Sequence, residues 1–294
     1  MAERINFYDQ IARNKRKSVF LMILVFIVFV ALGYVISMAF TPGDFFFIMV
    51  LSIIFSISYL LISYYNCDKI AVASVGAVPA DRNQFRQLYN SVEGLTLASG
   101  LPMPKVYVMK NEQINAFASG RDPKHAVVCV TTGALEKLNK QELEGVLAHE
   151  LSHISNYDIK FMTLVAVMVG MIAIISQFFL RSMWFRGNDR ESKGNAIFIV
   201  IGIVMAILAP IAVQLVQLAI SRKREFTADA TAVQFTRYPT GLMNALKKIK
   251  DDKPMNVSKA IAPLFMSDPF RRKFANMLST HPPIDERIKV LAEM

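Results

Sequence analysis

Two uncharged apolar runs near the amino terminus constrain this chain more than any other feature. Val19 to Phe40 is 22 residues long, enough to cross the ~30 Å hydrocarbon core of a bilayer at about 1.5 Å per residue. A second run, Phe45 to Tyr65, follows a Pro- and Gly-containing turn over Thr41 to Asp44. The first run is longer than the h-region of a signal peptide, which is about 7–15 residues. The pattern therefore predicts a retained membrane hairpin.

Basic residues beside the apolar runs indicate which side of the membrane they face. The net charge is +10, and part of it lies at Arg13 to Lys17 and at Arg222 to Arg224. Basic flanks are typical of cytoplasmic membrane edges, so we expect both ends of the hairpin in the cytoplasm. No basic stripe interleaves aromatic residues on a polar face, so we expect the bilayer as a partner and no nucleic acid.

Two later apolar runs predict a second hairpin. Phe161 to Leu180 and Ala196 to Leu218 are separated by a charged segment around Arg186 to Arg190, and Gln177 and Pro210 interrupt them. If the polar segments on either side share one site, the chain between them crosses the membrane zero times or twice, and the lengths favour two crossings. The sequence thus predicts a multi-pass membrane protein with about four transmembrane helices. Its expected parts are residues 1–65, 66–160, 161–220 and 221–294.

The polar segment between the hairpins predicts an α+β fold. Pro104 to Met109 and His125 to Thr131 are β-branched runs flanked by turn residues and predict strands, whereas Asp81 to Leu97 and Ala134 to Leu138 predict helices. The chain has two cysteines, Cys67 and Cys129. They form no CxxC pair, so we expect buried small side chains and neither a disulfide nor a thiolate zinc site.

The helix that follows carries a metal-binding pattern. Asn139 and Glu142 have the spacing of a capping box at its start. His149 and His153 are four residues apart, so their imidazoles project from one face and converge on one point, as Zn²⁺ ligands do. Glu150 is offset by about 100° and stands where a carboxylate can take a proton from a water molecule. The alternative, two ordinary polar residues on an exposed helix face, is less consistent with a capped amphipathic helix.

A second constellation supplies carboxylates at the same helical spacing. Glu225 and Asp229 are four residues apart on another predicted helix. Glu225 would complete a His₂Glu ligand set, and Asp229 would accept the free ring N–H of a ligating histidine and fix its tautomer. The alternative is a solvated acidic pair that balances Arg222 to Arg224. The neighbouring HExxH helix favours the metal site.

These motifs in this order resemble the M48 family of membrane zinc peptidases, and more narrowly the bacterial HtpX heat-shock proteases. The resemblance rests on Asn115 to Gly120, His149 to His153, Arg224 to Asp229 and Ser279 to Pro283. It implies a gluzincin-like α+β domain with one Zn²⁺ per subunit. It also implies an endopeptidase of the cell (inner) membrane, with a cytoplasmic active site, that cleaves misfolded or damaged membrane proteins in quality control and stress response.

The same resemblance assigns roles within the helices. It implies that His149, His153 and Glu225 are the zinc ligands, that Glu150 is the general base and that Asp229 supports a ligand.

Four further residues take roles from the resemblance or from their position. Asn115 and Ala116 would lie on a substrate-facing edge strand, where a peptide adds through main-chain hydrogen bonds; otherwise Asn115 is a turn residue. His281 either begins the last helix or donates a hydrogen bond to the oxyanion, with Arg287 in support.

Three rival functions fit parts of the pattern. A CAAX-prenyl-type endopeptidase shares the motifs but usually has more membrane spans than the four predicted here. A non-cleaving membrane chaperone or scaffold has no use for a base such as Glu150 beside the ligands. A channel or transporter would place ionisable residues within its apolar runs, and these runs have none.

Overall fold

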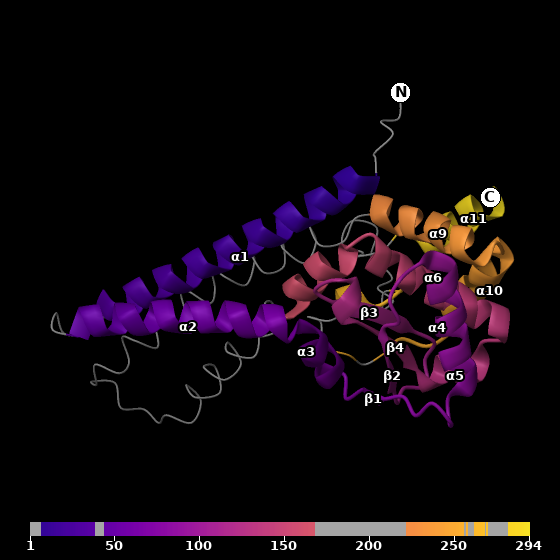
Figure 1. Ribbon diagram of the computed structural model, residues 1–294, viewed down its shortest axis with the longest axis horizontal. Helices are drawn as coiled ribbons and strands as arrows, with labels where there is room; N and C mark the ends of the chain where they lie inside the picture. Colours follow the sequence, from indigo (N-terminus) through magenta and orange to yellow (C-terminus); the bar gives the residue numbers. More distant parts are fainter. Residues whose placement is uncertain are drawn as a thin grey trace.

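The computed structural model describes residues 7–38, 44–167, 222–255, 257, 262–267, 269 and 282–294. A long helical hairpin extends to one side of a mixed α/β part (Figure 1). Three predicted features lie outside the described residues: the turn before Asp44, most of the second apolar hairpin, and His281. The structure does not test these predictions.

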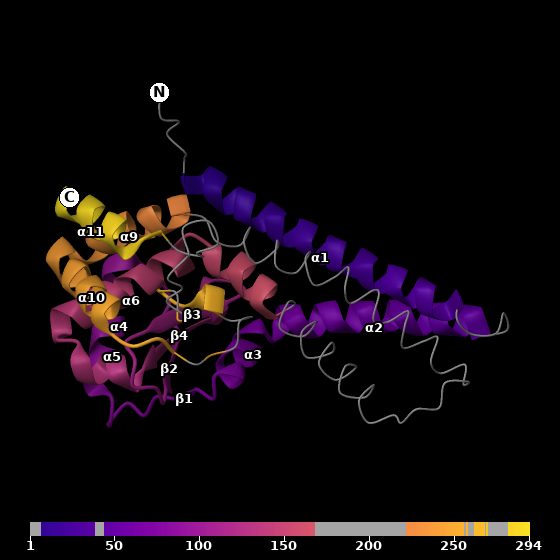
Figure 2. The ribbon, with the colours of Figure 1, turned by 180° about the vertical axis from the view of Figure 1, so that it is seen from behind.

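A helical hairpin is present over the first two apolar runs, and its first helix begins at Phe7, before the apolar run that starts at Val19. Helices α1 (Phe7–Met38) and α2 (Phe45–Tyr65) lie side by side in both views (Figures 1 and 2). Between them the ring of Phe29 meets Tyr59 edge-on, with centroids 4.8 Å apart. Among the described helices, α2 alone has the length and mean hydropathy, 2.6, of a membrane span, and 11% of that span is buried. The apolar side chains that it leaves exposed are suited to contact with lipid.

A four-stranded sheet forms the centre of the α/β part. Its strand order is β1-β2-β4-β3, with β2 and β4 parallel and the other two pairs antiparallel. The strands are β1 (Val78–Pro79), β2 (Lys105–Met109), β3 (Ala116–Gly120) and β4 (Ala126–Thr131). The helices around it are α3 (Cys67–Ser74), α4 (Arg86–Ser99), α5 (Thr132–Lys137), α6 (Lys140–Ser155), α9 (Arg222–Thr236), α10 (Pro239–Asp251) and α11 (Ile284–Ala292), with residues 158–167 also helical and short 3₁₀ turns η2 (Pro123–His125) and η3 (Ala262–Leu264).

The predicted elements of the polar segment are confirmed, with shifted ends. Both predicted strands begin one residue later than expected, so His125 lies in η2 and not in β4. The helix expected from Asp81 begins at Arg86. The reason is local: the Asp81 carboxylate accepts hydrogen bonds from the backbone N–H groups of Asn83 and Gln84, which favours a turn over a helix start.

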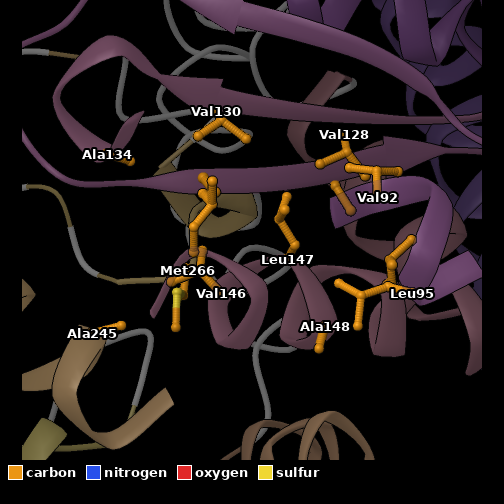
Figure 3. Packing of buried hydrophobic residues seen from close by; sticks show 14 of the residues in the cluster. Val92, Leu95, Val128, Val130, Ala134, Val146, Leu147, Ala148, Ala245 and Met266 are labelled. Carbon is orange, nitrogen blue, oxygen red and sulfur yellow. The ribbon is translucent and has the colours of Figure 1, made fainter. Parts of the chain in front are cut away.

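The main core lies between one face of the sheet and helices α4, α6 and α10. Val128 and Val130 of β4 point toward Val146 and Leu147 of α6 (Figure 3). Alternate residues of β4 point to the opposite face, where Cys129 is buried. Burial of both faces of β4 agrees with its β-branched sequence. Cys67 and Cys129 are both buried and free, as predicted.

Helix α6 is held closely by α10. A Cβ built on Gly145 would lie 2.6 Å from the backbone nitrogen of Leu242, and one built on Gly241 would lie 2.5 Å from the carbonyl oxygen of Gln141. Glycine at both positions is therefore what allows the two backbones to approach. Close approach at Gly145 fixes α6 on its partner one turn before His149.

The helix over residues 158–167 connects α6 to the helical hairpin of α1 and α2. Phe161, Leu164 and Val165 are buried in one cluster with Leu21 and Val25 of α1. The polar segment that ends with α6 is thus packed directly on the hairpin, close to the expected membrane surface.

Candidate metal centre

Helix α6 brings two imidazoles together. The predicted capping box is present: Asn139 Oδ1 accepts from the Glu142 N–H at 2.9 Å, and Glu142 Oε2 accepts from the Asn139 N–H at 2.8 Å. From this fixed start, His149 and His153 project from the same face, with ring centroids 4.9 Å apart. Both side chains are buried. They are therefore neither exposed nor solvated, which removes the alternative considered for them.

Helix α9 places a carboxylate against both rings. Glu225 Oε2 lies 3.6 Å from His149 Nε2, and Glu225 Oε1 lies 3.6 Å from His153 Nε2. In the part of the chain that the structure describes, this is the one group of three possible ligands whose donor atoms all lie within 4.8 Å of one another. Ligands at about 2.0–2.2 Å around a tetrahedral Zn²⁺ are about 3.4 Å apart. The donor spacing at Glu225 fits such an ion.

A second carboxylate lies on the far side of each imidazole. Asp229 Oδ1 is 2.8 Å from His149 Nδ1, as predicted, and Asp158 Oδ2 is 3.2 Å from His153 Nδ1. Each pairing directs the Nδ1 proton to a carboxylate and leaves Nε2 facing Glu225. The sequence prediction missed Asp158. Its only signal is a carboxylate five residues after the second histidine.

Arg287 holds Asp229 in place. Its Nε donates to Asp229 Oδ2 at 2.8 Å and its Nη2 donates to Asp229 Oδ1 at 2.6 Å. Burial raises the pKa of Asp229, but the Arg287 guanidinium and the hydrogen bonds from His149 and Arg287 outweigh burial and lower it. The sequence prediction placed Arg287 in support of His281, which lies outside the described residues, so that role is not tested; the structure shows Arg287 bound to Asp229.

The charges around His149 favour a cation in the site. Burial and the Arg287 guanidinium lower the pKa of His149, but hydrogen bonds to Asp229 and Glu225 outweigh them and raise it to about 9. A ring in this environment carries a proton at neutral pH unless a metal ion takes its place. The carboxylates of Asp229 and Glu225 therefore attract a positive charge, and Arg287 supplies part of it: its Nη1 lies 3.7 Å from Glu225 Oε2, and its Nη2 lies 3.3 Å from His149 Nδ1.

Glu150 is a buried carboxylate with an available oxygen. Its side chain is 1% exposed, and within the described part of the chain Oε1 has no hydrogen-bond partner. Burial raises the pKa of Glu150, and the nearby His149 and His153 oppose that shift. A carboxyl whose pKa is moved toward neutral pH is suited to take up and return a proton.

The predicted substrate edge is at the edge of the sheet but is not open. Ala116 belongs to β3, the outermost strand, and Asn115 precedes it. The carbonyl oxygen of Ala116 accepts from the Met266 N–H at 2.9 Å, and Asn115 Nδ2 donates to the Ser267 carbonyl at 3.3 Å. Asn115 and Ala116 are therefore buried beneath residues 262–267, which the sequence does not indicate.

Comparison with known proteins identifies a matching family and relatives along nearly the whole chain. The profile of peptidase family M48 matches residues 82–294. Proteins named protease HtpX homolog match nearly the whole chain. The one from Caldanaerobacter subterraneus is 46% identical, covering 98% of this chain and 97% of its own length. The one from Thermoanaerobacter pseudethanolicus is 45% identical, with 99% of both chains covered.

Among solved structures, the crystal structure of S. mikatae Ste24p aligns with a TM-score of 0.48 at 20% identity, over 95% of this chain and 65% of that one. A score at this level is too low to assign a common fold.

Proposed function

This chain belongs to peptidase family M48, and from that premise we propose that it is a zinc-dependent endopeptidase whose metal is held by His149, His153 and Glu225. Its family and its full-length relatives make it a membrane-anchored metalloprotease. The observation that carries the finer proposal is the convergence of three buried donors within 4.8 Å.

The choice of zinc rests on the donor chemistry. Two neutral imidazoles and one carboxylate form the His₂Glu set typical of catalytic zinc in peptidases, which leaves a fourth position open. Asp229 and Asp158 hold the Nδ1 sides of the rings, which supports ligation through Nε2. A bound zinc ion would act as a Lewis acid on the scissile carbonyl and lower the pKa of a water molecule.

Glu150 would move the proton. Its raised pKa allows it to accept a proton from the attacking water and then return it to the leaving amine. Burial of the carboxylate excludes bulk water, which strengthens its electrostatic interactions with the reacting groups.

His281 is proposed to stabilise the oxyanion by donating a hydrogen bond. The support for this proposal comes from the described residues that follow His281 in the sequence. Pro282 and Pro283 lead directly into α11, and Arg287 on α11 is bound to Asp229 within the centre.

The contact between α1 and Asp158 supports a side of the membrane for the active site. Asn14 of α1, in the basic segment Arg13 to Lys17, donates a hydrogen bond to Asp158 beside the metal centre. The active site then lies on the side of that basic segment, which is the cytoplasmic side by the positive-inside rule. We propose that it cleaves misfolded or damaged membrane proteins reached at the cytoplasmic surface of the inner membrane.

An extended substrate would add to β3 as a further strand and contact Asn115 and Ala116. Such pairing would replace the contact between Met266 and Ala116. A substrate bound through its main chain has little sequence preference, which suits a quality-control protease.

The test of the ligand set is zinc content. Full-length protein and the variants His149→Ala and Glu225→Ala are purified in detergent and measured by elemental analysis, with His125→Ala as the matched control. His125 is exposed and bonded to Asp122, away from the centre. The proposal expects one zinc per chain in wild type and in His125→Ala, and loss of zinc in the other two. Wild-type zinc content in His149→Ala would overturn it.

A further inference from the structure

The two histidines of the metal centre are supported by different parts of the chain. On the His149 side, Asp229 is held by Arg287, so both supports belong to the carboxyl-terminal segment. On the His153 side, Asp158 takes the place of Asp229. The residue that holds Asp158 comes from the membrane hairpin.

Asp158 is fully buried and uses both carboxylate oxygens. Oδ2 faces His153 Nδ1 at 3.2 Å, and Oδ1 accepts from Asn14 Nδ2 at 2.7 Å. Its side chain is 0% exposed. A buried carboxylate bound on both sides is fixed in orientation, and a fixed acceptor in turn fixes the ring that donates to it.

Asn14 is an unusual side chain for its place on α1. It is 3% exposed, whereas its basic neighbours Arg13, Lys15 and Arg16 are exposed. A neutral amide donates to Asp158 without cancelling its charge, so Asp158 stays a strong acceptor for His153. Among the described residues, Arg224 on α9 forms an ion pair with this carboxylate, but its Nη1 lies farther away than Asn14, at 3.8 Å from Asp158 Oδ1.

We propose that Asn14 is a positioning residue for the metal centre: through Asp158 it fixes the ring of His153 and makes the cytoplasmic end of the membrane hairpin part of the zinc site. The proposal rests on the zinc-peptidase function above. Its consequence is that the affinity for zinc depends on how α1 is seated against the helix over residues 158–167. The membrane hairpin is then more than an anchor.

The experiment compares isosteric variants of the full-length protein. Asn14→Asp replaces the donor by a second carboxylate facing Asp158, and Asn14→Leu removes the donor while keeping the number of side-chain heavy atoms. Ser18→Ala is the matched control, because Ser18 is equally buried one turn later on α1 and bonds only to the Asn14 carbonyl among the described residues. The first readout is the zinc dissociation constant, measured by chelator competition. The second is the visible absorption of the cobalt-substituted protein, which reports ligand geometry.

The expected loss of zinc affinity is larger for Asp158, which contacts His153 directly, than for Asn14, which acts through Asp158. Residues that support a metal ligand typically change affinity by about 10- to 100-fold, so Asp158→Asn is expected in that range and Asn14→Asp at roughly tenfold. Asn14→Leu is expected to weaken zinc by several-fold and to shift the cobalt spectrum. Ser18→Ala is expected to leave both readouts as in wild type, whatever it does to stability.

Wild-type zinc affinity and an unchanged cobalt spectrum in folded Asn14→Asp would overturn the proposal. If Asn14→Asp does not fold, the same result in Asn14→Leu overturns it. Equal losses in Ser18→Ala and Asn14→Leu would also overturn it, because the effect would then be general destabilisation of α1. Failure of wild type to bind zinc would instead refute the proposed function, so the two failures are distinguishable.

Discussion

The close contact between α6 and α10 gives a sharp prediction for Gly145→Ala. The added methyl would lie 2.6 Å from the Leu242 nitrogen, 2.8 Å from its Cα and 3.0 Å from the Gly241 carbonyl carbon. All three atoms belong to the backbone, so no side chain can turn away. An ordinary contact begins at 3.4 Å, and the helices must therefore separate by about 0.8 Å, an overpacking that costs up to ~3 kcal/mol.

Helix propensity partly offsets this loss of folding stability, because alanine in a helix interior is about 1 kcal/mol more favourable than glycine. The net destabilisation of Gly145→Ala is then about 2 kcal/mol, or a fall of about 4–8 °C in Tm. Displacement of α6 also moves His149 and Glu150, and a misplacement of about 1 Å can lower the cleavage rate ~100-fold.

Gly94→Ala is the matched control. Gly94 is also inside a helix, α4, but a Cβ there has nothing within 4 Å. This variant should gain up to ~1 kcal/mol, which raises Tm by about 2–4 °C, with unchanged activity. Both variants are measured by thermal unfolding in the same detergent. A Tm for Gly145→Ala at or above that of wild type would refute the close approach of the two helices.

Three further perturbations have defined outcomes. Asn139→Ala removes the cap of α6 and should cost about 1–2 kcal/mol in chemical denaturation; no change would refute the capping box. Asp229→Asn should weaken zinc binding about 10- to 100-fold in chelator competition, and wild-type affinity would refute its role on His149. Asp252 tests the acid dependence of folding. Burial raises its pKa, but hydrogen bonds from Lys137 and the Ile114 N–H outweigh burial and lower it. Its contribution is therefore full above the unfolded pKa near 3.8 and is lost as pH falls through the lower folded value, so the stability gap between wild type and Asp252→Asn should narrow from about pH 6 to about pH 3. A constant gap would refute this.

The parts of the site that the sequence predicts are those encoded within one helix. Asn139, Glu142, His149 and His153 lie within 15 residues, and helical periodicity alone brings them to their observed contacts. Glu225 and Asp229 were also predicted from their four-residue spacing. Their contact with α6 needed only the assumption that the two helices face each other.

The contacts that the sequence does not predict depend on turns and on distant segments. The backbone of Tyr157 has a φ of 56°, rare for a residue other than glycine, and α6 ends just before it, so periodicity carries no information about Asp158. Asn14 lies 144 residues from Asp158. Strand β3 has the sequence Ala-Phe-Ala-Ser-Gly, without a β-branched residue, and it becomes a strand because it pairs with β4. The pairing of Met266 with Ala116 leaves no mark in the local sequence.

The most direct test of the central claim is the Glu150→Gln variant. The amide keeps the shape of the carboxylate and leaves the donors of His149, His153 and Glu225 in place, but it cannot accept the proton. Wild type and variant are compared for zinc content and for cleavage of an unfolded membrane protein in detergent. We predict equal zinc in both proteins and loss of cleavage in the variant. Cleavage at the wild-type rate by zinc-loaded Glu150→Gln would contradict the account.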